Sequence, residues 1–324
     1  MDDAYPLKYS KKYPFNRYTD YLQSVFGKRM QKVSIDAGFT CPNIDGNIGH
    51  GGCIYCNNAS FNPNYHSEAN DIFKQIDQGI SKFIRRNPDI GYVAYFQSHT
   101  NTYGRIDELR ELYEKAAEHP QIEGLIIATR PDCIGAEVLE LLASINKKLF
   151  VGVEIGIEST NNATLKRINR RHTFEQTIDA IYRIKEAGLH LGGHVILGLP
   201  GETEVDILEH AKTLSNMPLD TMKLHQLQII KNTALANLYR QSPETIPLFA
   251  LEEYIDLCIR FAELLSPDMV IERFASESKT ELLEVEVWQG VKNHQLADFI
   301  TNEMKRRGTW QGRNFKAVRN CTEK

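Results

Sequence analysis

Residues 33–56 read VSIDAGFTCPNIDGNIGHGGCIYC, and this stretch joins a short apolar run to a loop that holds three of the six cysteines. The run at 33–37 has the pattern of a strand buried on both faces. Cys41, Cys53 and Cys56 follow it in a segment rich in glycine and asparagine. In parallel α/β sheets, ligand sites lie beyond the carboxyl ends of strands. We therefore expect a cysteine-lined site at the end of the first strand.

The same order of strand and then helix recurs along the chain. Further strands are predicted at 92–97, 125–129, 149–157, 194–199 and 222–229, and amphipathic helices at 68–86, 105–118, 135–146, 173–187 and 202–215. Alternating strands and helices form parallel sheets with right-handed crossovers. The sequence thus predicts an α/β fold: a partial (β/α)6 TIM-like barrel with a mainly helical C-terminal extension.

Three segments are predicted: a basic N-terminal segment at 1–30, the barrel core at 31–240, and an extension at 241–324. The extension holds predicted helices at 251–265 and 293–307, and we expect it to pack on the barrel and bind substrate. The net charge of −4 argues against a uniformly basic nucleic-acid-binding surface. Both ends of the chain are nevertheless basic, which is typical either of solvated tails or of a local phosphate-binding patch.

The composition is that of an ordinary soluble protein, with 42% hydrophobic and 25% charged residues. No apolar run approaches the roughly 18 residues that a membrane-spanning helix needs. The N-terminus lacks the basic start and apolar stretch of a signal peptide. We therefore expect a cytoplasmic protein with no membrane partner; the oligomeric state is left open.

Three nearby cysteines fit two kinds of metal site. Thiolates are the ligands of iron–sulfur clusters, and three of them on a four-iron cluster leave one iron with a vacant position. A zinc site completed by His50 or His66 is the alternative, since Cys-x2-Cys pairs are common in such sites. Zinc ribbons usually present two such pairs, which favours the cluster without excluding zinc. Cys133 and Cys258 are interpreted as small core residues.

The three cysteines, with Tyr55 just before the last one, resemble the motif of the radical S-adenosylmethionine (SAM) superfamily. The resemblance covers roughly residues 30–235, and the spacing is similar to the branch that contains the elongator catalytic subunit. Residues 8–16 and 33–43 resemble the corresponding stretches of small bacterial proteins of the YhcC/YtqA type, and this resemblance extends over nearly the full length of the chain. Some of these, under the name MnmL, are associated with tRNA wobble-uridine modification.

The resemblance implies an enzyme that holds a [4Fe–4S] cluster on Cys41, Cys53 and Cys56 and binds SAM at the vacant iron. One electron from the reduced cluster would break the sulfonium bond of SAM. The resulting 5′-deoxyadenosyl radical would abstract a hydrogen atom from the substrate. A flavodoxin- or ferredoxin-type protein is the expected electron donor.

The resemblance also implies which residues contact SAM. An aromatic residue in the cysteine loop and two glycines after the fifth strand would lie against the adenine. An acid–serine pair at the end of the fourth strand would contact the ribose. A polar residue at the end of the second strand would meet the methionine amino group, although the usual Gly-Gly-Glu is missing there. An arginine would bind the methionine carboxylate. Tyr55, Gly198 and Gly201 are the residues expected at the adenine, and Glu158 and Ser159 are the pair expected at the ribose. Gln97 is expected at the amino group and Arg170 at the carboxylate.

The sixth predicted strand carries the candidate catalytic residues Lys223, His225 and Gln226, and His194 on the fifth strand is a further candidate. Because side chains alternate along a strand, only one face can see the barrel interior. Polar groups inside a barrel must be satisfied, either by a substrate or by an internal hydrogen-bond network. Both remain open here.

The preferred function, which rests mainly on the resemblance, is modification of a tRNA wobble-uridine side chain, from carboxymethylaminomethyl toward aminomethyl. One alternative is a radical oxidase or decarboxylase acting on a small molecule such as a porphyrinogen. Another alternative is a zinc-dependent RNA-binding module that is not an enzyme.

Overall fold

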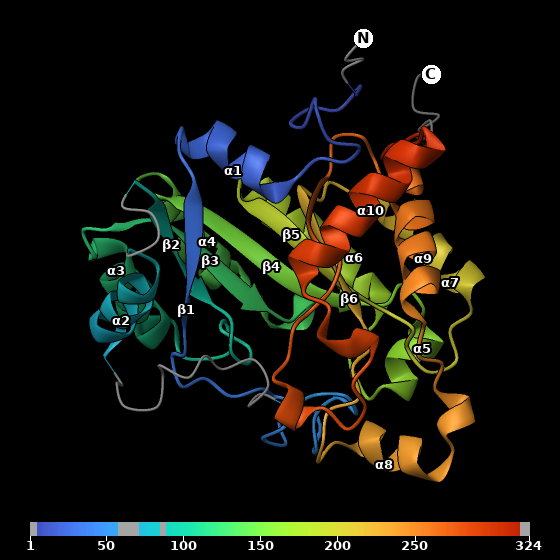
Figure 1. The fold of residues 1–324 in the computed structure, drawn as a ribbon. Helices are drawn as coiled ribbons and strands as arrows, with labels where there is room; N and C mark the ends of the chain where they lie inside the picture. Colours follow the sequence, from blue (N-terminus) through green and yellow to red (C-terminus); the bar gives the residue numbers. More distant parts are fainter. Residues whose placement is uncertain (1–4, 58–70, 85–88, 318–324) are drawn as a thin grey trace, which may run out of the picture.

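The computed structural model describes residues 5–57, 71–84 and 89–317. Seven parallel strands form one sheet in chain order, curled into a half-barrel with the helices outside it (Figure 1). The strands are β1 (Met30–Ile35), β2 (Gly91–Phe96), β3 (Ile122–Thr129), β4 (Phe150–Glu158), β5 (His190–Leu197), β6 (Thr221–Gln226) and β7 (Val270–Arg273). The predicted partial barrel is confirmed.

Helices connect the strands and extend the barrel at its C-terminal side. The connecting helices are α2 (Ile72–Ile84), α3 (Ile106–Glu118), α4 (Ala136–Asn146), α5 (Asn162–Arg167), α6 (Phe174–Glu186) and α7 (Glu204–Ser215). The remaining helices are α1 (Tyr18–Phe26), α8 (Ala234–Gln241), α9 (Leu251–Leu264) and α10 (Asn293–Arg307). In this described part of the chain no helix is long and apolar enough to span a membrane.

The strand β7 was not predicted from the sequence, which assigned its residues to an irregular part of the helical extension. It is four residues long, and only its first two side chains are apolar. So short a run carries no periodicity that separates a strand from a loop. The helices α1, α5 and α8 were also missed. The predicted border at residue 240 and the substrate-binding role of the extension stay predictions.

Alternation along the strands gives the sheet two different faces. Outward residues such as Val33, Leu125 and Val153 are fully buried under the helices in the main hydrophobic core. Inward residues of β4 and β6 are polar, among them Glu154 and Lys223, and they too are buried. The interior of the half-barrel is therefore polar along β4 and β6, whereas inward residues of β2 and β3, Val93 and Ile126, form a small hydrophobic cluster.

The sheet has three irregularities in strand pairing, of which one lies between β2 and β3 and the other two beside the polar side chains of β4 and β6. Between β4 and β5 the register passes from Gly156 to Glu158, so one extra residue stands on β4. Between β6 and β7 it passes from Ile271 to Arg273, and Glu272 is the extra residue on β7. A β-bulge of this kind bends the strand and re-aims its side chains.

The open edge of β7 is covered by the N-terminal segment. Ile271 donates its backbone N–H to the carbonyl of Asn16, 2.9 Å away, and Arg17 forms a parallel bridge with Ile271. The Asn16 side chain donates to the carbonyls of Pro267 and Met269 at 2.6 and 3.1 Å. These contacts place the start of the chain at the amino edge of the sheet, opposite the cysteine loop in Figure 1.

Candidate active site

An open cavity lies inside the half-barrel. Cys41, Cys53 and Cys56 line it together with residues from β2, β3, β4, β6 and β7. The loop that carries the cysteines turns through two glycines with left-handed backbone, Gly51 at φ 78° and Gly52 at φ 71°. Glycine adopts this conformation without steric cost, which lets the loop fold back over the strand ends.

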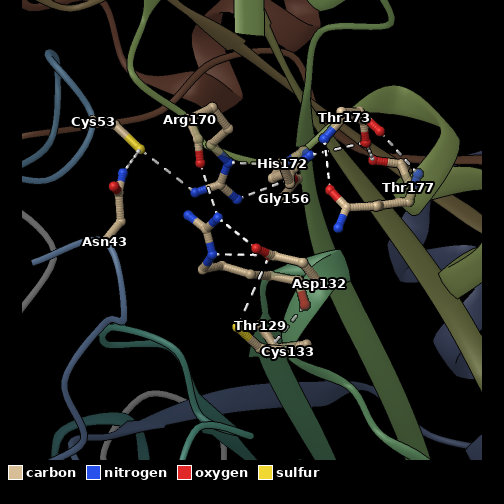
Figure 2. A network of polar contacts seen from close by, with 12 residues as sticks. Asn43, Cys53, Thr129, Asp132, Cys133, Gly156, Arg170, His172, Thr173 and Thr177 are labelled. Carbon is tan, nitrogen blue, oxygen red and sulfur yellow. Dashed lines mark hydrogen bonds and ion pairs between the residues drawn. The ribbon is translucent and has the colours of Figure 1, made fainter. Parts of the chain in front are cut away.

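The thiol of Cys53 lies among hydrogen-bond donors. Asn43 Nδ2 and Arg170 Nη1 each lie 3.7 Å from its Sγ atom, as Figure 2 shows. Burial, together with the neighbouring Cys53, raises the pKa of Cys56 to about 12, so this thiol is protonated unless a metal displaces the proton. Donors aimed at a sulfur stabilise a thiolate once it forms.

These three thiols fit an iron–sulfur cluster. Thiolates are the ligands such clusters take, and all three lie on the wall of one cavity. Within residues 5–57, 71–84 and 89–317, no three His, Cys, Asp or Glu side chains gather closely enough to hold a single metal ion. His50, considered above as a zinc ligand, is exposed, and His66 lies outside the described residues.

Arg170 connects the cysteine loop to β4. Its Nη2 donates to the carbonyl of Gly156 at 2.9 Å, and its Nε donates to His172 Nε2 at 3.0 Å (Figure 2). Nη2 also lies 3.3 Å from Glu158 Oε1. With the contact to Cys53, the guanidinium has four partners within the protein. We therefore assign Arg170 a positioning role toward the loop; its predicted contact with the methionine carboxylate stays a prediction.

Glu158 ends β4 in a strained conformation, with φ at 66°. Burial alone would raise the pKa of its carboxyl group, but His194 and Arg170 lower it to about 2. The His194 Nδ1 atom lies 3.3 Å from Glu158 Oε2, and its ring packs edge-on against His225 with centroids 3.7 Å apart. A negatively charged carboxylate is thus held at the cavity wall, where it can accept hydrogen bonds from hydroxyl groups.

The structure brings most of the predicted site residues together. Tyr55, Gln97, Glu158, Arg170, Lys223 and His225 all line the cavity. Ser159 and Gln226 do not. Ser159 Oγ donates to Glu202 Oε1 at 2.5 Å, and Gln226 lies on the outward face of β6, where it pairs with the backbone of Ser276 at 2.9 and 3.0 Å. Alternation along β6 explains why Gln226 faces away when Lys223 and His225 face in.

The two predicted adenine-contacting glycines lie just outside the cavity lining. Both have left-handed backbone, with φ 93° at Gly198 and 85° at Gly201. A Cβ atom at Gly198 would lie 2.9 Å from the ring of Phe249, and one at Gly201 would overlap the guanidinium of Arg167. Contacts within this chain therefore explain why both positions require glycine. Their predicted role toward adenine stays a prediction.

A ring of four charged side chains lies at the cavity, which two of them, Glu154 and Lys223, line; most of this ring was not predicted from the sequence. Lys32 Nζ lies 2.7 Å from Glu154 and 2.6 Å from Glu272, and Lys223 Nζ lies 2.5 and 3.1 Å from the same two carboxylates. Lys223 also donates to Tyr95 Oη at 3.1 Å. The one sequence signal for this ring is a charged residue at an inward position of a predicted strand. Lys223 and Glu154 are two such residues.

The pKa values in this ring are strongly shifted. The two glutamates raise the pKa of Lys32 above its ordinary value, although burial alone would lower it. Burial lowers the pKa of Lys223 to about 8, with Lys32 and Arg273 adding to the effect and the glutamates opposing it. The ring thus pairs two lysines with two glutamates, and each lysine contacts both carboxylates.

Comparison with known proteins identifies the family and the fold. Residues 44–214 match the family model of the Radical SAM superfamily, and residues 219–306 match that of the Radical_SAM C-terminal domain. The chain belongs to the radical SAM superfamily. The YtqA protein of Bacillus subtilis is 30% identical over 316 residues, which cover 97% of each chain.

Two further relatives come from Methanocaldococcus infernus. A tRNA uridine(34) acetyltransferase is 29% identical over 208 residues, 63% of this chain and 36% of that protein. The solved structure of archaeal Elp3 lacking residues 1–46 superposes with a TM-score of 0.67 at 17% identity, covering 87% of this chain and 64% of the other. As a member of the superfamily, the present chain uses a [4Fe–4S] cluster and SAM. The three cysteines of its cavity are the residues that fit the cluster.

Proposed function

We propose that this radical SAM enzyme modifies a wobble-uridine side chain of tRNA, converting carboxymethylaminomethyl toward aminomethyl. The observation that carries the proposal is the similarity over 63% of this chain to a protein whose name gives uridine 34 of tRNA as its target. The near full-length similarity to YtqA supports the same branch of the superfamily. A flavodoxin- or ferredoxin-type electron donor stays a prediction.

The cavity supports such chemistry through the placement of its side chains. When bound, the cluster and SAM supply a 5′-deoxyadenosyl radical that takes a hydrogen atom from the substrate. Tyr55, Gln97 and Glu158 line the cavity with the cysteines and are proposed to hold SAM. Lys223 and His225 line it from β6 and are proposed to face the substrate. Both side chains are buried, so they lie at the inner end of the site rather than at its surface.

Within residues 5–31 and 303–317, no residue of the basic ends lines this cavity. The N-terminal segment and residue 311 pack against the loop that leads into β7, at the amino edge of the sheet, and Lys32 is buried in the ionic ring. Two exposed cations do flank the cysteine loop: Arg171 beside Gly49, and Lys231, whose carbonyl accepts from Asn57. We propose these as phosphate contacts for tRNA, so binding should weaken steeply with salt.

The test is nucleoside analysis by mass spectrometry of tRNA from a strain that lacks the gene. We expect carboxymethylaminomethyluridine to accumulate and aminomethyl derivatives to disappear. The intact gene should restore the profile, and Cys56→Ala should not, because a cluster ligand is lost. The matched control is Cys133→Ala, because Cys133 does not line the cavity and burial raises its pKa to about 12, which keeps it a thiol.

Unchanged wobble nucleosides in the deletion strain would contradict the proposal and direct the search to small-molecule substrates. Restoration by Cys56→Ala would show that the modification does not require the cluster.

A further inference from the structure

Arg273 is a cation without a carboxylate partner at the cavity wall. The four charges of Lys32, Glu154, Lys223 and Glu272 pair among themselves. Arg273 follows Glu272 directly, ends β7 and lines the same cavity, yet it forms no ion pair with the described residues. Arg273 is partly buried, and its Nε atom is buried without a hydrogen bond to the described residues. Charged groups inside proteins are usually paired, so a partly buried guanidinium with no carboxylate beside it is suited to an anionic ligand.

Individual atoms on this wall also lack partners. Arg273 Nε and His225 Nε2 are both buried without a hydrogen bond to any described residue. Buried polar atoms are nearly always hydrogen-bonded, because an unpaired one costs about 1–3 kcal/mol. Arg273 is close enough to His225 to help hold the pKa of that imidazole well below its ordinary value, after the larger effect of burial. Arg273 is paired in register with Lys223, two residues before His225, so the two unpaired atoms belong to cavity-lining side chains of adjacent strands.

The β7 bulge is what creates this arrangement. In a regular strand, Glu272 and Arg273 would point to opposite faces of the sheet. Because Glu272 is the extra residue, its carboxylate reaches both lysines of the ring while Arg273 still lines the cavity. Bulges that re-aim side chains are common next to active sites.

Arg273 is distinct from the cations beside the cysteines. Arg170 contacts Cys53, and Arg130 donates to the carbonyl of Arg170, 2.9 Å away. Arg273 has no such contact and instead influences Tyr95, Lys223 and His225. The two arginines next to the cysteines are thus engaged within the protein, Arg170 by Glu158 and Arg130 by Asp132, whereas Arg273 has no carboxylate partner among the described residues.

We propose that Arg273, with His225 beside it, binds the carboxylate of the substrate side chain. The inference rests on the proposed function, because a carboxymethylaminomethyl group ends in a carboxylate that aminomethyl lacks. A guanidinium binds a carboxylate through two parallel hydrogen bonds. The subsite therefore distinguishes the substrate from its product and lets the product leave.

Binding is tested on anaerobically prepared protein carrying its cluster and SAM. The probes are tRNA anticodon stem–loops with 5-carboxymethylaminomethyluridine, its carboxamide analogue, or 5-aminomethyluridine at the wobble position. We expect the acid to bind about tenfold tighter than the carboxamide, the value of one charge-assisted hydrogen bond. Arg273→Gln should reduce this preference to less than about twofold, and Arg273→Lys should keep part of it.

The control variant is Arg105→Gln, because the Arg105 side chain is 77% exposed and does not line the cavity; it should keep the full preference. Equal binding of acid and carboxamide by the intact protein would overturn the inference, as would an undiminished preference in Arg273→Gln. Loss of SAM binding in that variant would also overturn it, because Arg273 would then serve the cofactor. A preference that depends on Arg273, with unchanged wobble nucleosides in the deletion strain, would support the subsite and contradict only the assigned tRNA reaction.

Discussion

Glu154 shows, at the scale of single residues, how a strand interior accommodates charge. Its two carboxylate oxygens each receive one lysine, Lys32 on β1 and Lys223 on β6. Burial alone would raise the pKa of Glu154, but the two lysines lower it below its ordinary value. A buried carboxylate is tolerated only with such partners, since an isolated buried ion costs several kcal/mol.

Replacing Glu154 by Gln should therefore destabilise the protein strongly. The change keeps the shape of the side chain but leaves two buried lysines with one carboxylate. We expect a loss of about 3 to 5 kcal/mol in the free energy of unfolding, measured by urea denaturation at pH 7. The control is Glu114→Gln, whose half-exposed pair with Arg110 should contribute nothing measurable.

The effect of Glu154→Gln should also depend on pH in a defined direction. The carboxyl group has its folded-state pKa below the ordinary value of 4.5. Its contribution is thus fully present above pH 4.5 and is lost as the pH falls toward the folded-state pKa. The difference in stability between the wild type and the variant should shrink in acid. A difference that grows below pH 4.5 would contradict this assignment.

At the scale of elements, the turn between β5 and α7 depends on a glycine. Gly201 has φ at 85°, and Arg167 fills the space where a side chain would start, with its Nη1 donating to the carbonyl of Pro200 at 2.8 Å. Gly201→Ala should cost about 1–2 kcal/mol for the left-handed backbone, with a further loss when Arg167 is displaced. Urea unfolding measures this.

Gly135→Ala is the matched control for this turn. Gly135 has φ at −82°, and nothing lies within 4 Å of a Cβ atom there. Its stability should change by no more than about 0.5 kcal/mol. If the two variants lost equal stability, the conformation of Gly201 would not be the reason for its glycine.

The sequence predicts the regular elements well and the irregular ones poorly. Strands β1 to β6 carry apolar runs long enough to be recognised, and the three cysteines follow the first of them. Glu272 and Arg273 carry no such signal, because their inward direction comes from a bulge that pairing with β6 creates. Lys32 was counted with the basic N-terminal residues, since charge along the chain does not reveal which face of a strand it occupies. For Glu272, Arg273 and Lys32 alike, the direction of the side chain is decided by how the strands pair in the folded protein.

At the scale of the whole molecule, the two ends of the chain close the half-barrel beside β7. Gln311 and Asn16 are both fully buried. Gln311 Oε1 accepts from the backbone N–H of Asn16 at 2.9 Å, and its Nε2 donates to the carbonyls of Ser266 and Met269, each 2.7 Å away. The strand that carries Arg273 into the cavity is thus held by residues from both ends of the sequence.

Gln311→Ala should loosen β7 without disturbing the rest of the sheet. The change leaves one buried donor and two buried acceptors with fewer partners, and we expect a loss of about 2–3 kcal/mol in stability. Hydrogen exchange followed by mass spectrometry should show faster exchange in peptides covering residues 266–273. Peptides covering β3, in the middle of the sheet, should be unchanged, because local opening is confined to cooperative units.

The control for this prediction is Gln121→Ala, because Gln121 is exposed; this variant should match the wild type throughout. Unchanged exchange at residues 266–273 would mean that the N-terminal segment alone secures β7.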